Sequence, residues 1–269
     1  MIITVIGNDH RQKELAKLLN RQHDTIYLGG NEEFKKVKSI LKISDVVIFP
    51  LPFTRDNKTI NTTCFDIAKT IDTISKETIV FLPDYKLNEK RMVIDYNQDE
   101  NFVLQNAFYT AETAVALSIL NTPFSLTEAK ILVLGCGRIG KTLTKLLNPF
   151  CKDVTVSARK EQDFLFLKQQ KTNYIHTNEI EDLSTFNVIF NTIPQTVLSP
   201  KTILSISKDA LIVDLASKNS LLIGANANYI DAKALPANYC MQSSANSLFK
   251  FIDRHLRNNR KVSEFYEWH

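Results

Sequence analysis

The stretch Lys130-Ile-Leu-Val-Leu-Gly-Cys-Gly-Arg-Ile-Gly140 decides the fold of the second half of the chain. It begins with an unbroken apolar run, which is typical of a parallel strand covered on both faces. Gly135 permits a tight turn, Gly137 lets the backbone approach a pyrophosphate, and Gly140 lets the following helix pack on the strand. The N–H groups at the start of that helix suit phosphate oxygens. We therefore predict a dinucleotide-binding turn, with contacts from Gly135, Gly137, Arg138, Ile139 and Gly140.

The end of the next strand indicates which dinucleotide binds. NAD sites carry an Asp or Glu there for the ribose 2′-hydroxyl, whereas this chain has Ser157, Arg159 and Lys160. Arginine can hold a 2′-phosphate bidentately. The sequence therefore favours NADP over NAD, with these three residues as ligands. The alternative is that Arg159 and Lys160 are only the solvated start of a helix.

Two later strand ends are expected to flank the same site, because ligands of doubly wound sheets lie outside the carboxyl ends of the strands. The alternative for each is an ordinary polar turn. The predicted cofactor contacts there are Asn191, Thr192, Ile193, Pro194, Ala216 and Ser217, and the segment from Asp214 to Lys218 is expected near the reacting ring.

The rest of the chain alternates short apolar runs with amphipathic stretches, which predicts α/β domains with parallel sheets. Predicted strands are 2–6, 25–28, 45–49 and 78–82, then 130–134, 153–157, 188–191, 211–215 and 229–232. Predicted helices are 11–20, 32–41 and 61–75, then 139–147, 161–170, 201–206 and 243–257. A further helix, 111–120, is expected to connect the two sheets, with Thr110 as N-cap and Glu112 in its first turn. The tail 262–269 has no clear pattern.

Bulk properties exclude several classes of protein. The chain has 269 residues, 44% of them apolar, and a formal charge of +4, which does not argue for nucleic acid. We find no signal peptide and no apolar run long enough for a membrane helix. The cysteines lack Cys-x-x-Cys spacing, so disulfides and a structural zinc are not expected. We expect a cytoplasmic protein without a metal.

Substrate contacts are predicted in the first half. Arg11, at a helix start, and Arg55, after an apolar strand, are candidates for binding a carboxylate, although surface cations fit the pattern equally well. Glu112 is either a catalytic carboxylate or only a first-turn helix residue.

Together these motifs resemble the family of dipicolinate synthase A-subunits, over about residues 2–250. The resemblance rests on the segments 5–12, 133–140, 156–159, 191–194 and 212–217, and on Asn106, Thr110 and Glu112. Their order and spacing are more specific than any one of them.

The resemblance implies a flavodoxin-like domain (1–109), a connecting helix and linker (110–126), an NADP-binding Rossmann domain of the 2-hydroxyacid-dehydrogenase type (127–242), and a terminal helix and tail (243–269). It implies NADP-linked oxidation of a dihydrodipicolinate-like intermediate to pyridine-2,6-dicarboxylate, in sporulation, with a separate dipicolinate synthase B-subunit. We expect a homo-oligomer. The substrate would contact Arg11, Arg55, Thr110 and Gln242, with Glu112 or Lys218 handling the proton.

The chain departs from the family pattern on the substrate side. Lys218 begins a segment where the family has Arg-Pro-Gly-Gly, and Gln242 replaces a lysine. A second hypothesis is therefore an NADP(H)-binding partner or sensor without turnover. A third, a D-2-hydroxyacid dehydrogenase, is less favoured, because Ser217 stands where those enzymes have arginine and His255 lacks a preceding proline.

Overall fold

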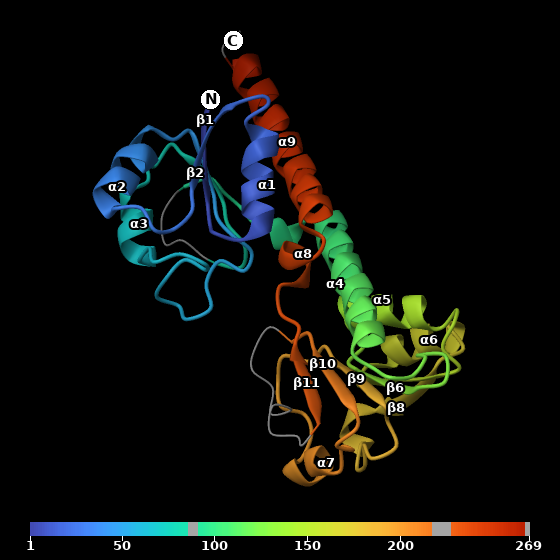
Figure 1. Ribbon diagram of the computed structural model, residues 1–269. Coiled ribbons are helices and arrows are strands. Elements are labelled where there is room, and N and C mark those ends of the chain that lie inside the picture. Colours follow the sequence, from blue (N-terminus) through green and yellow to red (C-terminus); the bar gives the residue numbers. More distant parts are fainter. Residues whose placement is uncertain (86–90, 217–226, 267–269) are drawn as a thin grey trace. The chain divides into compact units, whose positions relative to one another are not determined.

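The computed structural model describes residues 1–85, 91–216 and 227–266, the last eight of them by backbone alone. The chain divides into two compact units (Figure 1). The first unit comprises Met1–Asn106 and Pro236–His269, and the second comprises Ala107–Leu235. Within the described residues, no helix is both long and apolar enough to cross a membrane.

The first unit is built on a five-stranded parallel sheet. Its strands are β1 (Ile2–Ile6), β2 (Asp24–Leu28), β3 (Val46–Ile48), β4 (Ile79–Phe81) and β5 (Val93–Ile94). They lie in the order β2-β1-β3-β4-β5. This is the flavodoxin-like order, so the expected fold class is confirmed for the first half.

Helices cover both faces of this sheet because alternate residues of each strand point to opposite faces. Ile3 and Val5 of β1 pack with α1 (His10–Leu19) and α9 (Met241–Tyr266). Ile6 packs on the other face with α2 (Phe34–Ile43) and α3 (Ile67–Thr73). Figure 1 shows α9 running alongside α1.

The second unit contains a six-stranded parallel sheet. Its strands are β6 (Lys130–Leu134), β7 (Asp153–Ala158), β8 (Asn173–His176), β9 (Val188–Asn191), β10 (Leu211–Asp214) and β11 (Asn228–Asp231). The order is β11-β10-β9-β6-β7-β8. This is the doubly wound order of Rossmann domains, and it confirms the prediction for the second half.

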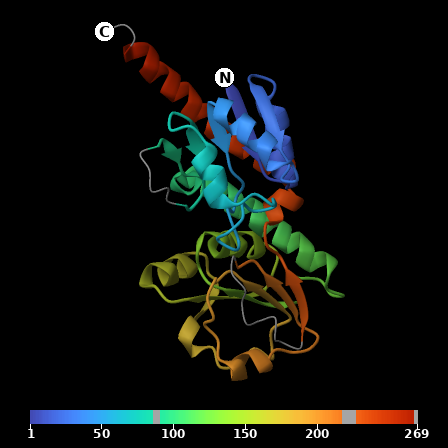
Figure 2. The same cartoon turned by 90° about the vertical axis from the view of Figure 1, so that its left-hand side faces the viewer.

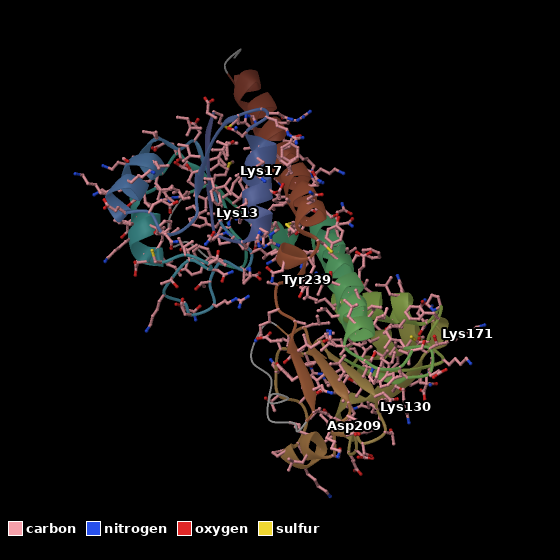
Figure 3. All side chains as sticks on the ribbon, in the orientation of Figure 1. Lys13, Lys17, Lys130, Lys171, Asp209 and Tyr239 are labelled. Carbon is pink, nitrogen blue, oxygen red and sulfur yellow. The ribbon has the colours of Figure 1, made fainter. Side chains whose placement is uncertain are left out.

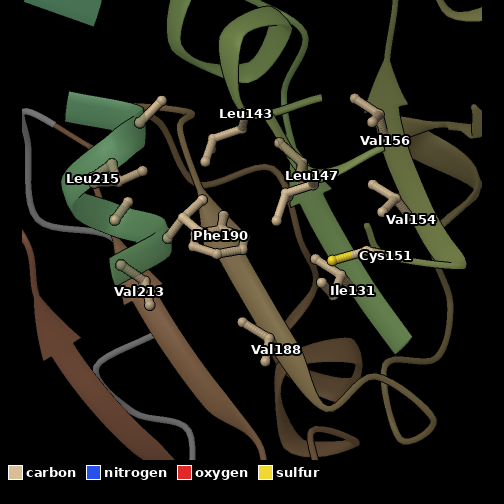
Figure 4. Packing of buried hydrophobic residues seen from close by; sticks show 14 of the residues in the cluster. Ile131, Leu143, Leu147, Cys151, Val154, Val156, Val188, Phe190, Val213 and Leu215 are labelled. Atoms are coloured by element: carbon tan, nitrogen blue, oxygen red, sulfur yellow. The ribbon is translucent and has the colours of Figure 1, made fainter. Parts of the chain in front are cut away.

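The core of the second unit lies on both faces of this sheet. On one face, Ile131, Val156 and Phe190 pack with α5 (Arg138–Leu147), α6 (Glu161–Gln169) and the second part of α4 (Glu100–Leu120) (Figure 4). On the other face, Leu132 and Ile189 pack with α7 (Pro200–Leu204). Figure 2 shows the short orange helix α7 on the opposite side of this sheet from α5 and α6. The short elements η1 (Tyr96–Gln98), η2 (Thr177–Glu179) and α8 (Leu235–Asn238) complete the chain.

The predicted connecting helix was wrong at its start. The helix α4 begins at Glu100, and the Asp99 carboxylate accepts a hydrogen bond from the Phe102 N–H at 2.7 Å, as a cap does. Thr110 is therefore an interior residue of α4 and no N-cap, and Glu112 lies three turns into the helix. Polar residues between 100 and 110 had obscured the apolar positions Phe102 and Ala107, which are buried.

Other boundaries also differ from the prediction. The helix expected at 61–75 is confined to α3, because residues 61–66 form a turn closed by a bridge between Thr59 and Asp66. The short strands β5 and β8 were missed. Residues 262–266 of the patternless tail continue α9, and this C-terminal helix packs in the first unit.

Candidate functional site

The glycine-rich turn after β6 has the geometry that a dinucleotide turn needs. Gly135 has a φ of +97°, which side-chain-bearing residues rarely adopt. A Cβ on Gly140 would lie 2.0 Å from the Gly135 carbonyl oxygen, so the start of α5 packs directly on the turn. Both glycines are therefore required for this close approach of helix and strand.

Gly137 differs from its two neighbours, because a Cβ there would meet nothing within 4 Å. Gly137 is exposed and is the N-cap residue of α5, and no side-chain hydrogen bond caps that helix. Open space in front of a helix N-terminus fits a phosphate group, which the N–H groups and the helix dipole favour. The residues present therefore fit the pyrophosphate of a dinucleotide.

The turn also lies where ligands of doubly wound sheets bind. β6 is paired with β7 on one side and with β9 on the other. The helix after β6 covers one face of the sheet and the helix after β9 covers the opposite face, so the chain changes direction between these strands. Such a switch point forms a crevice at the carboxyl ends of the strands. The opposite edge is marked by Lys130, which begins β6, and by Lys171 and Asp209, which come just before β8 and β10 (Figure 3).

Ser157 supports the turn from the neighbouring strand. Its side chain is fully buried, and its Oγ accepts a hydrogen bond from the Gly135 N–H at 3.1 Å. The Thr177 hydroxyl lies 3.3 Å from the same oxygen. Ser157 was predicted as a direct cofactor contact, and in the structure it is occupied in holding Gly135.

Arg159 and Lys160 directly follow β7 and are both exposed. Within the described part of the chain, neither side chain forms an ion pair. The nearest carboxylates in sequence, Glu161 and Asp163, are in the first turn of α6, and Asp163 pairs with Lys141 at 2.7 Å. The two cations thus remain available beside the turn, at the strand end where a 2′-phosphate lies in NADP sites.

The loop after β9 packs against the turn. The Thr192 N–H and hydroxyl both donate to the Leu134 carbonyl, at 3.0 and 2.8 Å. A Cβ on Gly135 would lie 2.8 Å from Ile193 Cγ1. Pro194 is exposed. This loop therefore forms one wall of the predicted cofactor site.

The Asn191 side chain is buried behind that wall. It is 3% exposed. Its amide nitrogen donates a hydrogen bond to the Asp214 carboxylate, and its amide oxygen accepts one from the Ile193 N–H. Ala216 is also buried, and its N–H donates to Asp214 at 3.1 Å. Ser217 and Lys218, which sequence assigned to this region, lie outside the described residues.

The candidate substrate residues are divided between the two units. Arg11, in the first unit, is only 2% exposed; its guanidinium donates to the Leu51 carbonyl and lies 3.8 Å from the Asp9 carboxylate. Arg55 and Gln242 are exposed in the first unit. Thr110 is buried within α4, and Glu112 is exposed on the same helix in the second unit. Their roles stay predictions.

Two titratable side chains that could attract a catalytic interpretation are occupied structurally. Burial, with the nearby Asp163 carboxylate, raises the pKa of Cys136 to about 11 despite the opposing effect of Lys141. Its thiol therefore stays protonated near neutral pH and is a poor nucleophile. His255 Nδ1 lies 2.9 Å from the Phe251 carbonyl, and its ring packs on Phe251.

Sequence reasoning missed Thr177 and Tyr229 in the site region, and it placed Asp214 near the reacting ring without assigning it a structural role. Asp214 is fully buried, and the Tyr229 hydroxyl lies 2.6 Å from it. An acid that ends an apolar strand was the available signal for Asp214. The partners could not be read from sequence because they come from other strands. Among the described residues, no group of three or more His, Cys, Asp or Glu side chains could hold a metal.

Comparisons with known proteins agree with this architecture. The family model of the N-terminal domain of the dipicolinate synthase A-subunit matches residues 2–83. The A-subunit of dipicolinate synthase from Bacillus subtilis (strain 168) is 26% identical over 239 residues, which is 80% of this chain and 80% of that protein.

Two solved structures show the same fold. The crystal structure of the dipicolinate synthase A chain from Bacillus subtilis superposes with a TM-score of 0.77 at 19% identity, over 97% of each chain. Apo D-lactate dehydrogenase from Escherichia coli matches with a TM-score of 0.61 at 12% identity, over 97% of this chain and 98% of that one. The fold is thus dehydrogenase-like. The resemblance that the motifs indicated is confirmed, and the chain is similar to dipicolinate synthase A-subunits in sequence and in fold.

Proposed function

We propose that the protein is an NADP-dependent oxidoreductase that oxidises a dihydrodipicolinate-like intermediate to pyridine-2,6-dicarboxylate. The observation that carries the proposal is the open space at Gly137 in front of the N-terminus of α5. The similarity to dipicolinate synthase A-subunits supports the choice of substrate, and the dehydrogenase-like fold supports the class of reaction.

Each part of the cofactor has residues suited to it. The N–H groups at the start of α5 bind the pyrophosphate, and Arg138 and Ile139 supply two of them. Arg159 and Lys160 bind the 2′-phosphate through charge-assisted hydrogen bonds. The wall beside the ribose and nicotinamide is formed by Thr192, Ile193 and Pro194. Ala216 contacts the cofactor through its main chain.

NADP⁺, when bound, would supply the hydride acceptor; the dihydropyridine ring would become aromatic by giving up a hydride and a proton. The protein positions the two reactants and receives that proton. Glu112 or Lys218 is the group we assign to the proton, and Arg55 is the exposed cation for a substrate carboxylate. Arg11, Thr110 and Gln242 complete the proposed substrate contacts. The dipicolinate synthase B-subunit is the proposed partner, and we also propose that the chain self-associates in the cytoplasm.

The cofactor assignment is tested by titrating the purified chain with NADPH and with NADH. We expect NADPH to bind more tightly. Arg159→Gln should weaken NADPH binding by about tenfold or more, since a hydrogen bond to a charged group contributes roughly 1.5–3 kcal/mol. NADH binding should hardly change, because NADH has no 2′-phosphate.

Lys208→Gln is the matched control, because Lys208 is an exposed cation at the opposite edge of the same sheet, next to Asp209 (Figure 3). It should leave both affinities unchanged. Equal losses in Arg159→Gln and Lys208→Gln would remove the 2′-phosphate assignment. Binding of neither nucleotide to the unmodified chain would remove the function as a whole.

A second candidate is an NADP(H)-binding partner or sensor without turnover. Gln242, which replaces the family's lysine, is exposed in the first turn of α9 and favours this alternative. The two candidates are separated by measuring whether the absorbance of NADPH increases when NADP⁺ and freshly generated substrate are added, with and without the B-subunit. Tight NADPH binding with no absorbance change would support the sensor.

A further inference from the structure

Asp214 is a buried carboxylate behind the proposed cofactor site. It ends β10, it is fully buried, and both of its oxygens accept hydrogen bonds. Oδ1 accepts from the Asn191 amide at 2.9 Å and from the Ala216 N–H at 3.1 Å, and Oδ2 accepts from the Tyr229 hydroxyl at 2.6 Å. Burying a carboxylate is unfavourable unless it is satisfied in this way.

The contacts continue from Asp214 to the glycine turn. Because Asp214 takes the Asn191 amide nitrogen, the amide oxygen of Asn191 points to the Ile193 N–H, at 3.1 Å. Ile193 in turn lies against Gly135, where a Cβ would come within 2.8 Å of its Cγ1. One amide side chain thus couples the end of β10 to the wall of the turn.

We propose that Asp214 is a positioning residue for dinucleotide binding, which rests on the function proposed above. Asp214 and Asn191 are too buried to touch a ligand. They fix the loop that begins at Thr192, so that Gly135 keeps its backbone conformation and the N–H groups of α5 keep their direction. Tyr229 holds the carboxylate in place from the neighbouring strand β11. Asn191, predicted from sequence as a cofactor contact, has the same positioning role.

The test compares three variants by NADPH titration and thermal unfolding. Asp214→Asn should raise the dissociation constant for NADPH by about tenfold or more, because the neutral amide keeps only one acceptor oxygen for the hydrogen bonds that Asn191, Ala216 and Tyr229 donate. Tyr229→Phe, which keeps the carboxylate, should raise it by a smaller factor, about threefold to tenfold. The control is Asn148→Asp. It removes the two partly buried hydrogen bonds that the Asn148 amide donates to Gln170 and Thr172, at the far end of α5 from the glycine turn.

The control should lower the melting temperature and leave the dissociation constant within about twofold. The proposal is overturned if Asp214→Asn and Tyr229→Phe bind NADPH as well as the control does at temperatures where all three are folded. If Asp214→Asn does not fold, Tyr229→Phe alone decides between the outcomes.

A ligand-free measurement separates this inference from the proposed function. Hydrogen–deuterium exchange at the amides of 135–139 and 192–193 should rise selectively in Tyr229→Phe, relative to the amides of α6. A selective rise in a chain that binds neither NADPH nor NADH would retain the positioning role and discard the function. If exchange rose uniformly throughout the second unit, Asp214 would have only a general role in stability, and the positioning role would be discarded.

Discussion

Three glycines of one turn have three different physical reasons to be glycine. Gly135 adopts a positive φ, Gly140 has no room for a side chain, and Gly137 has room that nothing in the described chain fills. The first two requirements belong to the fold and would exist without a ligand. The open space at Gly137 is the part of the pattern that indicates binding.

Alanine substitutions should separate these roles. Gly137→Ala should change the free energy of unfolding by less than about 1 kcal/mol, yet weaken NADPH binding about tenfold or more by filling the space before α5. Gly140→Ala should cost roughly 1–3 kcal/mol of stability or more, because its Cβ meets backbone that cannot move aside. Chemical denaturation and NADPH titration measure both. Equal stability losses in the two variants would contradict this assignment.

At the scale of elements, the turn after β2 shows how one side chain organises a connection. The Glu32 carboxylate accepts hydrogen bonds from the N–H groups of Gly29 and Gly30, both at 2.8 Å. The Gly30 carbonyl accepts from the Cys64 N–H at 3.1 Å. The Glu32 turn therefore joins β2 to residues 61–66, the segment where a helix was wrongly predicted.

Stability should depend on pH through Glu32. Burial alone would raise its pKa, but the backbone N–H groups of the turn lower it overall. A lowered pKa stabilises the fold above the unfolded-state value of about 4.3, and that contribution is lost as pH falls through the folded value. Glu32→Gln should thus be less stable than the unmodified chain near pH 7, by about 1 kcal/mol or less for a partly exposed group, and the difference should shrink as the pH falls below the unfolded-state value.

Urea unfolding at three pH values measures this difference. Glu33→Gln is the control, since Glu33 is exposed and makes no capping hydrogen bond at the start of α2. The prediction would be wrong if the free energies of unfolding of the two variants depended on pH in the same way.

The main strands and the glycine turn could be predicted because both follow from local pattern. The parallel sheets follow from apolar runs, and the turn follows from glycine spacing. The fate of individual polar side chains could not be predicted. Ser157 and Asn191 were expected to face the cofactor, but the pairing of β6 with β7 and of β9 with β10 turns them toward Gly135 and Asp214. Contacts between strands depend on register, which the sequence of one strand does not contain.

At the scale of the whole molecule, the two units have separate hydrophobic cores. In the first unit, Phe251 of α9 packs on Phe81, Tyr96 and Phe102, with ring centroids 5.7–6.0 Å apart. Among the described side chains, the core clusters of the second unit contain no residue of α9. A change in α9 should therefore act on the first unit.

Phe251→Ala should destabilise the first unit by about 3–5 kcal/mol, as truncation of a buried aromatic does. Hydrogen–deuterium exchange should rise at the amides of β1, β3 and β4, and stay unchanged at those of β6 and β9. Phe150→Ala, at an aromatic residue that is 41% exposed, is the control and should change neither set. Equal increases in both sheets would show that the units unfold together.

In the sequence, the second unit (Ala107–Leu235) is inserted between the two parts of the first unit, and this order has a consequence for synthesis on the ribosome. The first sheet leaves the exit tunnel early, but the face that α9 covers stays bare until residues up to about 256 have left the tunnel as well. At roughly 5–20 residues per second, the delay is about 8–30 s. The inserted unit can fold in that interval. The first unit begins to be translated first but completes its fold last, so we expect a chaperone to bind its bare face in the meantime.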